Sequence, residues 1–77
     1  MLVLRFIRPN TTGVTFKREF SSYSDAEDFI EKRCEKLANN GWDLSELSGS
    51  NSLKGSIECT HDYEADILLI DWHTRKE

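Results

Sequence analysis

The sequence predicts an α+β fold of two layers, in which one helix packs on one face of an antiparallel sheet of four to five strands. Three observations predict it. Residues 24–42 alone have the length and apolar spacing of a helix. Segments on both sides of it alternate apolar and polar residues, as strands with one buried face do. Turn-forming clusters separate the segments in the order ββαβββ, and a single helix can cover one face of the resulting sheet.

The first two strands are predicted to form a hairpin. Residues 2–7 and residues 14–20 are rich in apolar, β-forming residues at every second position. The segment between them, residues 9–13, begins with Pro9 and ends with Gly13, and both residue types favour turns. Because so short a turn reverses the chain, we expect the second strand to pair with the first.

The helix is predicted from its two ends as well as from its apolar face. Ser24 and Glu27 have the spacing of a capping box at the start. Gly41 is a stop signal, and with Gly41 at C′ a contact between Trp42 and Leu37 would close a Schellman motif. The apolar face consists of Ala26, Phe29, Ile30, Cys34 and Leu37, with Ala38 beside them.

The last three strands are predicted over residues 42–47, 52–61 and 63–72. Gly55 interrupts the apolar series of the middle one, which indicates a bulge or the close approach of another element. Residues 67–70 are apolar on both faces of the last strand. The predicted core combines one side of that strand with Leu4, Phe6, Val14, Phe16, Phe29, Ile30, Leu37, Trp42, Leu44, Leu53 and Ile57.

Composition and charge favour a small acidic cytoplasmic protein with a single domain over residues 1–77. The net charge is −4, and residues 1–20 carry four basic side chains against one acidic one, so the acidic excess lies in the rest of the chain. An acidic total argues against broad nucleic-acid binding, which needs clustered Lys and Arg. There is no apolar run long enough to span a membrane, and the first residues lack the layout of a signal peptide.

No pattern in the sequence predicts catalysis or a cofactor, so we expect a non-enzymatic protein. Cys34 and Cys59 occupy inward positions, where free cysteines act as small apolar residues. An alternative prediction is a small metal-binding protein that uses Cys59, His61 and His73. Structural zinc sites usually have two close ligand pairs of the C-x₂-C type, which this chain lacks, so no metal ligand is assigned.

One feature of the predicted sheet indicates an interaction surface. A single helix leaves one face open, yet the first and last strands carry apolar side chains on both faces. An exposed apolar patch on a small protein commonly marks an interface. The acidic helix residues add electrostatic complementarity. The predicted partner-binding residues are Val3, Ile7, Leu68, Ile70 and Trp72, with Glu27, Glu31 and Glu35 on the helix.

Two resemblances bear on function. The helix running into Gly41-Trp42-Asp43-Leu44 resembles a motif in a group of small bacterial domains of unknown function. An antiparallel sheet with one acidic helix is also similar in size and layout to many small phage-encoded proteins that bind and block host or defence machinery. This second resemblance implies a phage- or mobile-element-type inhibitor. The function predicted is therefore a non-enzymatic protein-binding module, with a self-associating structural protein, as a homodimer, as an alternative.

Overall fold

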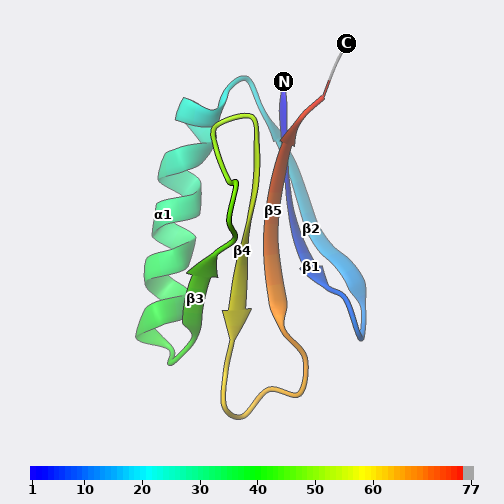
Figure 1. The fold of residues 1–77 in the computed structure, drawn as a ribbon, viewed down its shortest axis with the longest axis vertical. Helices are drawn as coiled ribbons and strands as arrows, with labels where there is room; N and C mark the ends of the chain where they lie inside the picture. The colour runs from blue at the N-terminus through cyan, green and yellow to red at the C-terminus, as the bar shows by residue number, and fades with distance from the viewer. Residues whose placement is uncertain (76–77) are drawn as a thin grey trace.

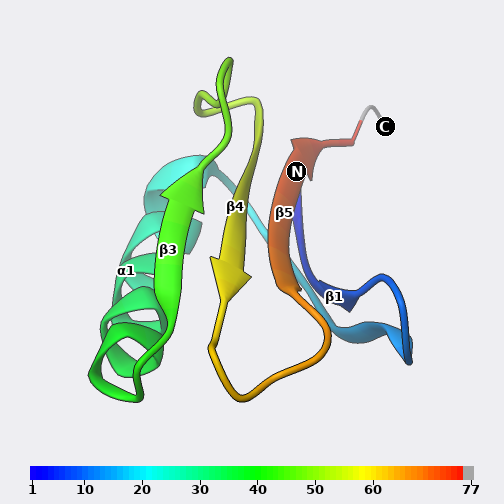
Figure 2. The same cartoon turned by 60° about the horizontal axis from the view of Figure 1, so that its bottom comes forward.

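The computed structural model describes residues 1–75 and confirms the predicted fold class (Figure 1). The elements in chain order are β1 (Leu2–Arg8), β2 (Gly13–Phe20), α1 (Tyr23–Asn39), β3 (Asp43–Glu46), β4 (Lys54–Thr60) and β5 (Leu68–Thr74). The five strands form one sheet in the order β2-β1-β5-β4-β3, and every neighbouring pair is antiparallel. Figure 2 shows α1 lying along one side of this sheet, behind β3, and no other helix or strand of residues 1–75 covers the opposite side. The helix contacts β1, β2 and β3.

The β1–β2 hairpin is confirmed, but it contains a bulge that changes one prediction. Phe6 pairs with Phe16, whereas Ile7 pairs with Val14, so Thr15 is an extra residue on β2. The Thr15 hydroxyl donates to the Phe6 carbonyl oxygen at 3.2 Å. Because an extra residue reverses which way the strand's side chains point, Val14 lies on the opposite face from Phe16 and is 51% exposed. The prediction that Val14 belongs to the core is therefore wrong.

The helix ends as predicted but begins differently. The Trp42 amide donates to the Leu37 carbonyl oxygen and the Gly41 amide to that of Ala38, both at 3.1 Å, which is the hydrogen-bond pair of a Schellman motif. Gly41 has a φ of +89°, a conformation that glycine adopts without a steric penalty. At the other end the N-cap is Ser22. The predicted capping box is wrong, because Ser24 already lies inside the first turn.

The core fills the space between α1 and one face of the sheet. Leu4, Phe6 and Ile30 are buried as predicted. The other apolar residues of this buried cluster are Leu2, Ala26, Cys59, Leu68, Ile70 and Trp72. Six further predicted core residues pack against this cluster while half-buried, namely Phe16, Phe29, Leu37, Trp42, Leu44 and Ile57. Leu53 was predicted wrongly: it is 64% exposed because it lies in the turn before β4, where its amide donates to the Asn51 side chain at 2.8 Å.

Gly55 allows the largest core side chain to pack against β4. A Cβ atom on Gly55 would lie 2.3 Å from Cζ2 of Trp72, so only glycine leaves room for the indole ring. The indole Nε1 donates to the Asn51 carbonyl oxygen at 2.8 Å. The predicted close approach of another element at Gly55 is thereby confirmed.

A buried carboxylate connects the β1–β2 turn to the start of β5. Asp66 accepts hydrogen bonds from the Thr11 hydroxyl at 2.9 Å and the Asn10 amide at 3.2 Å through Oδ2, and from the Ile67 amide at 2.8 Å through Oδ1. Burial opposes ionisation of this carboxyl, but the hydrogen bonds from Thr11, Ile67 and Asn10 outweigh it and lower the pKa of Asp66. The interaction therefore favours the ionised form and orders both loops.

Candidate functional site

The strand register shows which side chains lie on the open face of the sheet. Leu4 pairs with Trp72 and Phe6 with Ile70, so these residues share the helix-covered face. Residues between them in sequence must point the other way, since side chains alternate along a strand. The open face therefore carries Val3, Arg5 and Ile7 from β1, Leu69, Asp71 and His73 from β5, Lys54, Ser56 and Glu58 from β4, and Lys17 and Glu19 from β2.

The predicted contribution of β5 to an exposed patch is wrong. Leu68, Ile70 and Trp72 are at most 8% exposed and belong to the core under α1. Residues 67–70 are apolar on both sides, so the sequence does not distinguish which side of β5 meets the helix. The register with β1 makes the distinction, and it leaves Leu69 as the apolar residue of β5 on the open face.

Three apolar side chains do form a continuous strip on the open face. Ile7 pairs with Val14 on one side and with Leu69 on the other, so the three lie in one row across β2, β1 and β5. Val14 is 51% exposed, while Ile7 and Leu69 are half-buried. We refer to Ile7, Val14 and Leu69 as the apolar strip.

Val3 lies on the open face but is only 2% exposed. Arg75, which follows β5, forms an ion pair of 2.8 Å with Glu19 on β2. Because β1 lies between β5 and β2, this ion pair spans β1 at the level of Val3, which pairs with Glu19. Val3 is therefore covered by charged side chains and does not offer the exposed surface that was predicted for it.

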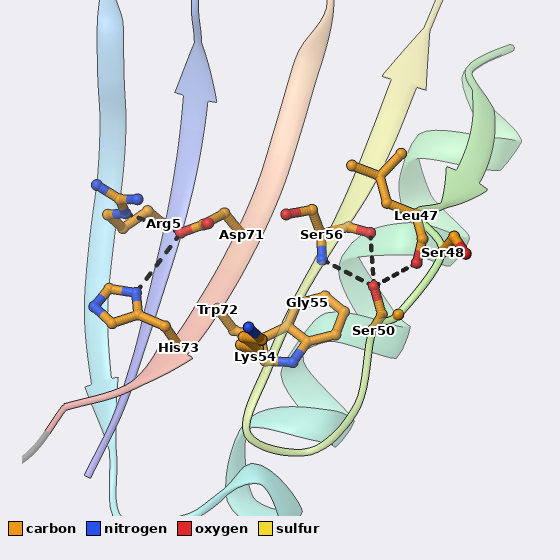
Figure 3. Close-up of a pocket in the computed structure, with 11 residues that line it drawn as sticks. Arg5, Leu47, Ser48, Ser50, Lys54, Gly55, Ser56, Asp71, Trp72 and His73 are labelled. Carbon is orange, nitrogen blue, oxygen red and sulfur yellow. Dashed lines mark hydrogen bonds and ion pairs between the residues drawn. The ribbon is translucent and has the colours of Figure 1, made fainter.

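Beside the apolar strip, the open face is hollowed. A recess of about 440 Å³ is lined by Arg5 of β1, Asp71 and His73 of β5, and Lys54 and Ser56 of β4, and residues 47–50 form its rim (Figure 3). We refer to it as the open-face hollow. Its floor is the sheet itself, where Arg5 pairs with Asp71 and Asp71 with Ser56.

The open-face hollow carries more positive than negative charge. Arg5 donates from Nε to Oδ1 of Asp71 at 2.9 Å, and Nδ1 of His73 lies 3.9 Å from the same oxygen. Asp71 is the only carboxylate that pairs with Arg5 within residues 1–75, and no ion pair in this part of the chain involves Lys54. The lining of the hollow thus carries the positive charges of Arg5 and Lys54 against the single carboxylate of Asp71.

The rim of the hollow is held by its own hydrogen bonds. The Ser50 hydroxyl donates to the Leu47 carbonyl oxygen at 2.7 Å and accepts from the Ser56 amide at 3.2 Å. The Asn51 side chain accepts from the amides of Leu53 and Lys54 at 2.8 and 3.1 Å. These bonds fix the β3–β4 loop against the start of β4, so the hollow has a defined wall beside Lys54.

The predicted acidic residues of the helix lie on a different surface. Glu27, Glu31 and Glu35 are exposed, but α1 covers the opposite face of the sheet. Burial raises the pKa of Tyr23, and the nearby charges of Glu27, Glu46 and Glu31 raise it further. The predicted acidic residues of the helix therefore do not continue the apolar strip.

The structure does not bring together the residues of the alternative metal site. Cys59 pairs with Leu68 at one end of β5, and His73 lies five residues further along that strand, roughly 16 Å away, on the opposite face. Burial raises the pKa of Cys59 to about 11, so its thiol is protonated at neutral pH. His61 accepts from the Tyr63 amide at 3.1 Å through Nδ1, and its Nε2 contacts the Asn40 carbonyl oxygen at 3.0 Å. No group of three metal-ligating side chains occurs within residues 1–75.

Sequence reasoning missed Arg5, Lys54 and Leu69 as surface residues that belong together. Alternation along each strand places Arg5 on the same face as Ile7, and Asp71 on the same face as His73. What the sequence lacked was the pairing of β1 with β5 and of β5 with β4, because strand order is not encoded in local patterns.

Comparison of the chain with protein-family models, with curated proteins and with solved structures gave no match. Within residues 1–75, no helix combines the length and the apolar character needed to cross a membrane.

Proposed function

We propose that this protein is a non-enzymatic protein-binding module that docks on its partner through the open face of the sheet. The observation that carries the proposal is the apolar strip, a row of three apolar side chains on a sheet face that no element of residues 1–75 covers. Strand side chains on an open face are usually polar, and an apolar row rimmed by charges is typical of an interface. By occupying its partner's surface, the module would act as an inhibitor.

The test is affinity capture from a lysate of the organism that encodes the chain, followed by affinity measurement with the purified captured protein. The decisive variant is the double substitution Val14→Ser/Leu69→Ser, which removes apolar area from the strip. Leu53→Ser is the matched control, because Leu53 is 64% exposed and lies away from the open face. We expect the strip variant to lose the captured protein and the control to retain it. Equal capture by both variants, with both folded by circular dichroism, contradicts the proposal.

A second candidate function, self-association, is favoured by the free edge of β2. The regularly paired part of this strand, residues 16–20, carries Lys17 and Glu19 on the same face and is centred on Arg18. Antiparallel pairing of two copies about Arg18 would place each Lys17 opposite Glu19 of the second copy, and opposite charges across strands are stabilising.

Light scattering over a range of concentrations tests this second candidate. Dimerisation should be weakened in Lys17→Glu and restored in the double variant Lys17→Glu/Glu19→Lys, which re-creates the opposite charges. A mass that stays monomeric at all concentrations contradicts it.

A further inference from the structure

We infer that the open-face hollow receives a carboxylate of the partner protein, so that the module recognises an acidic side chain lying next to an aliphatic one. This inference rests on the proposed docking through the open face and names the chemistry of the partner. It is carried by two observations, the uncompensated positive charge of the hollow and its spacing from the apolar strip.

The first observation is that the hollow holds N–H donors that have no acceptor within residues 1–75. Arg5 uses Nε to bind Asp71, and no hydrogen bond from its two terminal nitrogens occurs within residues 1–75. Lys54 is exposed and has no ionic partner in the same part of the chain. Asp71 restrains the guanidinium, and a restrained guanidinium can bind a carboxylate through two parallel N–H donors. On a chain of net charge −4, this is a local site of opposite sign that favours an anionic group.

The second observation is the distance between the hollow and the strip. Arg5 and Ile7 are two residues apart on β1, and Asp71 and Leu69 are two residues apart on β5, with all four side chains on the open face. Two residues along a strand correspond to about 7 Å. A partner surface that presents a carboxylate and an aliphatic side chain about 7 Å apart would occupy the hollow and contact the apolar strip at the same time.

Side chains on one face of a partner segment match this spacing. Residues i and i+4 of a helix are separated by about 6 Å along its axis, and residues i and i+2 of a strand by about 7 Å. The apolar contact would exclude water from the ion pair, which strengthens it, because the attraction between charges grows as the local dielectric constant falls. The hollow and the apolar strip together would therefore specify a partner better than either of them alone.

The experiment is a selection of phage-displayed random peptides on the immobilised protein. The tightest peptide is then synthesised and its affinity measured by fluorescence anisotropy. We expect the selected peptides to share an Asp or Glu two to four residues from an aliphatic residue. Replacing that acid by its amide should weaken binding at least about tenfold, which is the usual range for hydrogen bonds to charged groups.

Two variants of the protein test whether the hollow binds the acidic residue of the peptide. Lys54→Gln removes a charge that has no partner within residues 1–75, and Lys36→Gln on the far side of α1 is its control with the same change in net charge. The double variant Arg5→Gln/Asp71→Asn removes the guanidinium together with the carboxylate that depends on it. We expect Lys54→Gln and the double variant to weaken the acidic peptide several-fold and to leave its amide form unchanged, and we expect no change with Lys36→Gln.

The outcomes separate this inference from the proposed function. One outcome is that the peptides bind Val14→Ser/Leu69→Ser more weakly but bind Lys54→Gln with unchanged affinity. This would overturn the carboxylate site and leave the proposed docking through the open face intact. Selected peptides without an acidic residue would overturn it equally. A selection in which no peptide depends on the strip or on the hollow would contradict both proposals.

Discussion

The two faces of the sheet are built from the same strands but in different ways. On the face under α1, one row runs Phe16, Phe6, Ile70 and Ile57 across four strands, and every member is apolar. On the open face, the row running Lys17, Arg5, Asp71 and Ser56 contains no apolar residue. The apolar strip and Val3 are the exceptions on that second face. Apolar residues on the covered face thus belong to the core, whereas those of the apolar strip stay partly exposed and Val3 is covered by charged side chains.

The largest expected effect is that of removing the indole of Trp72. Trp72 is 1% exposed, packs over Gly55 and donates to Asn51, so Trp72→Ala leaves a large cavity and an unpaired carbonyl. We expect a loss of roughly 3–5 kcal/mol in the free energy of unfolding, measured by urea denaturation. Tyr63→Ala is the control, because Tyr63 is 92% exposed. A folded Trp72→Ala protein of near-normal stability would mean that Trp72 is not in the core.

A smaller effect on the same face is expected from Gly55→Ala. The added methyl group would lie 2.3 Å from the Trp72 ring and 2.9 Å from Ser50 Cβ, so the indole or the strand must shift. Overpacking of this kind costs about 1–3 kcal/mol, and a thermal melt would measure it. Lys54→Ala, at the neighbouring position on the open face, should change the melting temperature far less. Equal effects at the two positions would contradict the difference between the faces.

The third expected effect is a change in the pH dependence of stability. The pKa of Asp66 is lowered in the folded protein, so its ionised form stabilises the fold above the unfolded pKa of about 4, and this contribution is lost as the pH falls toward the folded pKa. Asp66→Asn should be less stable at neutral pH and should lose less stability on acidification, as measured by thermal melts from pH 7 to pH 2. Asp62→Asn, in the exposed part of the same loop, should keep the wild-type profile.

The smallest expected effect on stability is that of Val14→Ser in the apolar strip. Val14 is 51% exposed, and substitutions at such positions usually change the free energy of unfolding by no more than about 0.5 kcal/mol. Urea denaturation would measure this. A loss of more than about 1 kcal/mol would show that the strip is needed for folding and would remove the difference on which the proposed function depends.

The sequence predicted elements whose signals are local. The Schellman end at Gly41, the hairpin and the close packing at Gly55 each depend on residues that are near in sequence or on the shape of one residue. The helix start was misplaced by two residues, because Ser22 and Ser24 are both acceptable N-cap residues. Elements were thus found more reliably than their exact ends.

The candidate site could not be predicted in the same way. Val14 was assigned to the wrong face because the bulge at Thr15 leaves no mark in an alternating pattern. Leu68, Ile70 and Trp72 were assigned to the surface because β5 is apolar on both sides, and the pairing with β1 is what decides between them. The open-face hollow joins residues from three strands, so no window of sequence contains it.

The central position of β5 has a consequence for how the protein is made. The β1–β2 hairpin and the β3–β4 hairpin have no strand contact with each other, and β5, which follows both in the sequence, joins them. Each half would expose an apolar face until residues 68–74 emerge, and contacts between β1 and β5 span nearly the whole chain, which slows folding. The nascent chain therefore stays open to aggregation or to chaperone binding until residues 68–74 have left the ribosome and paired with both hairpins.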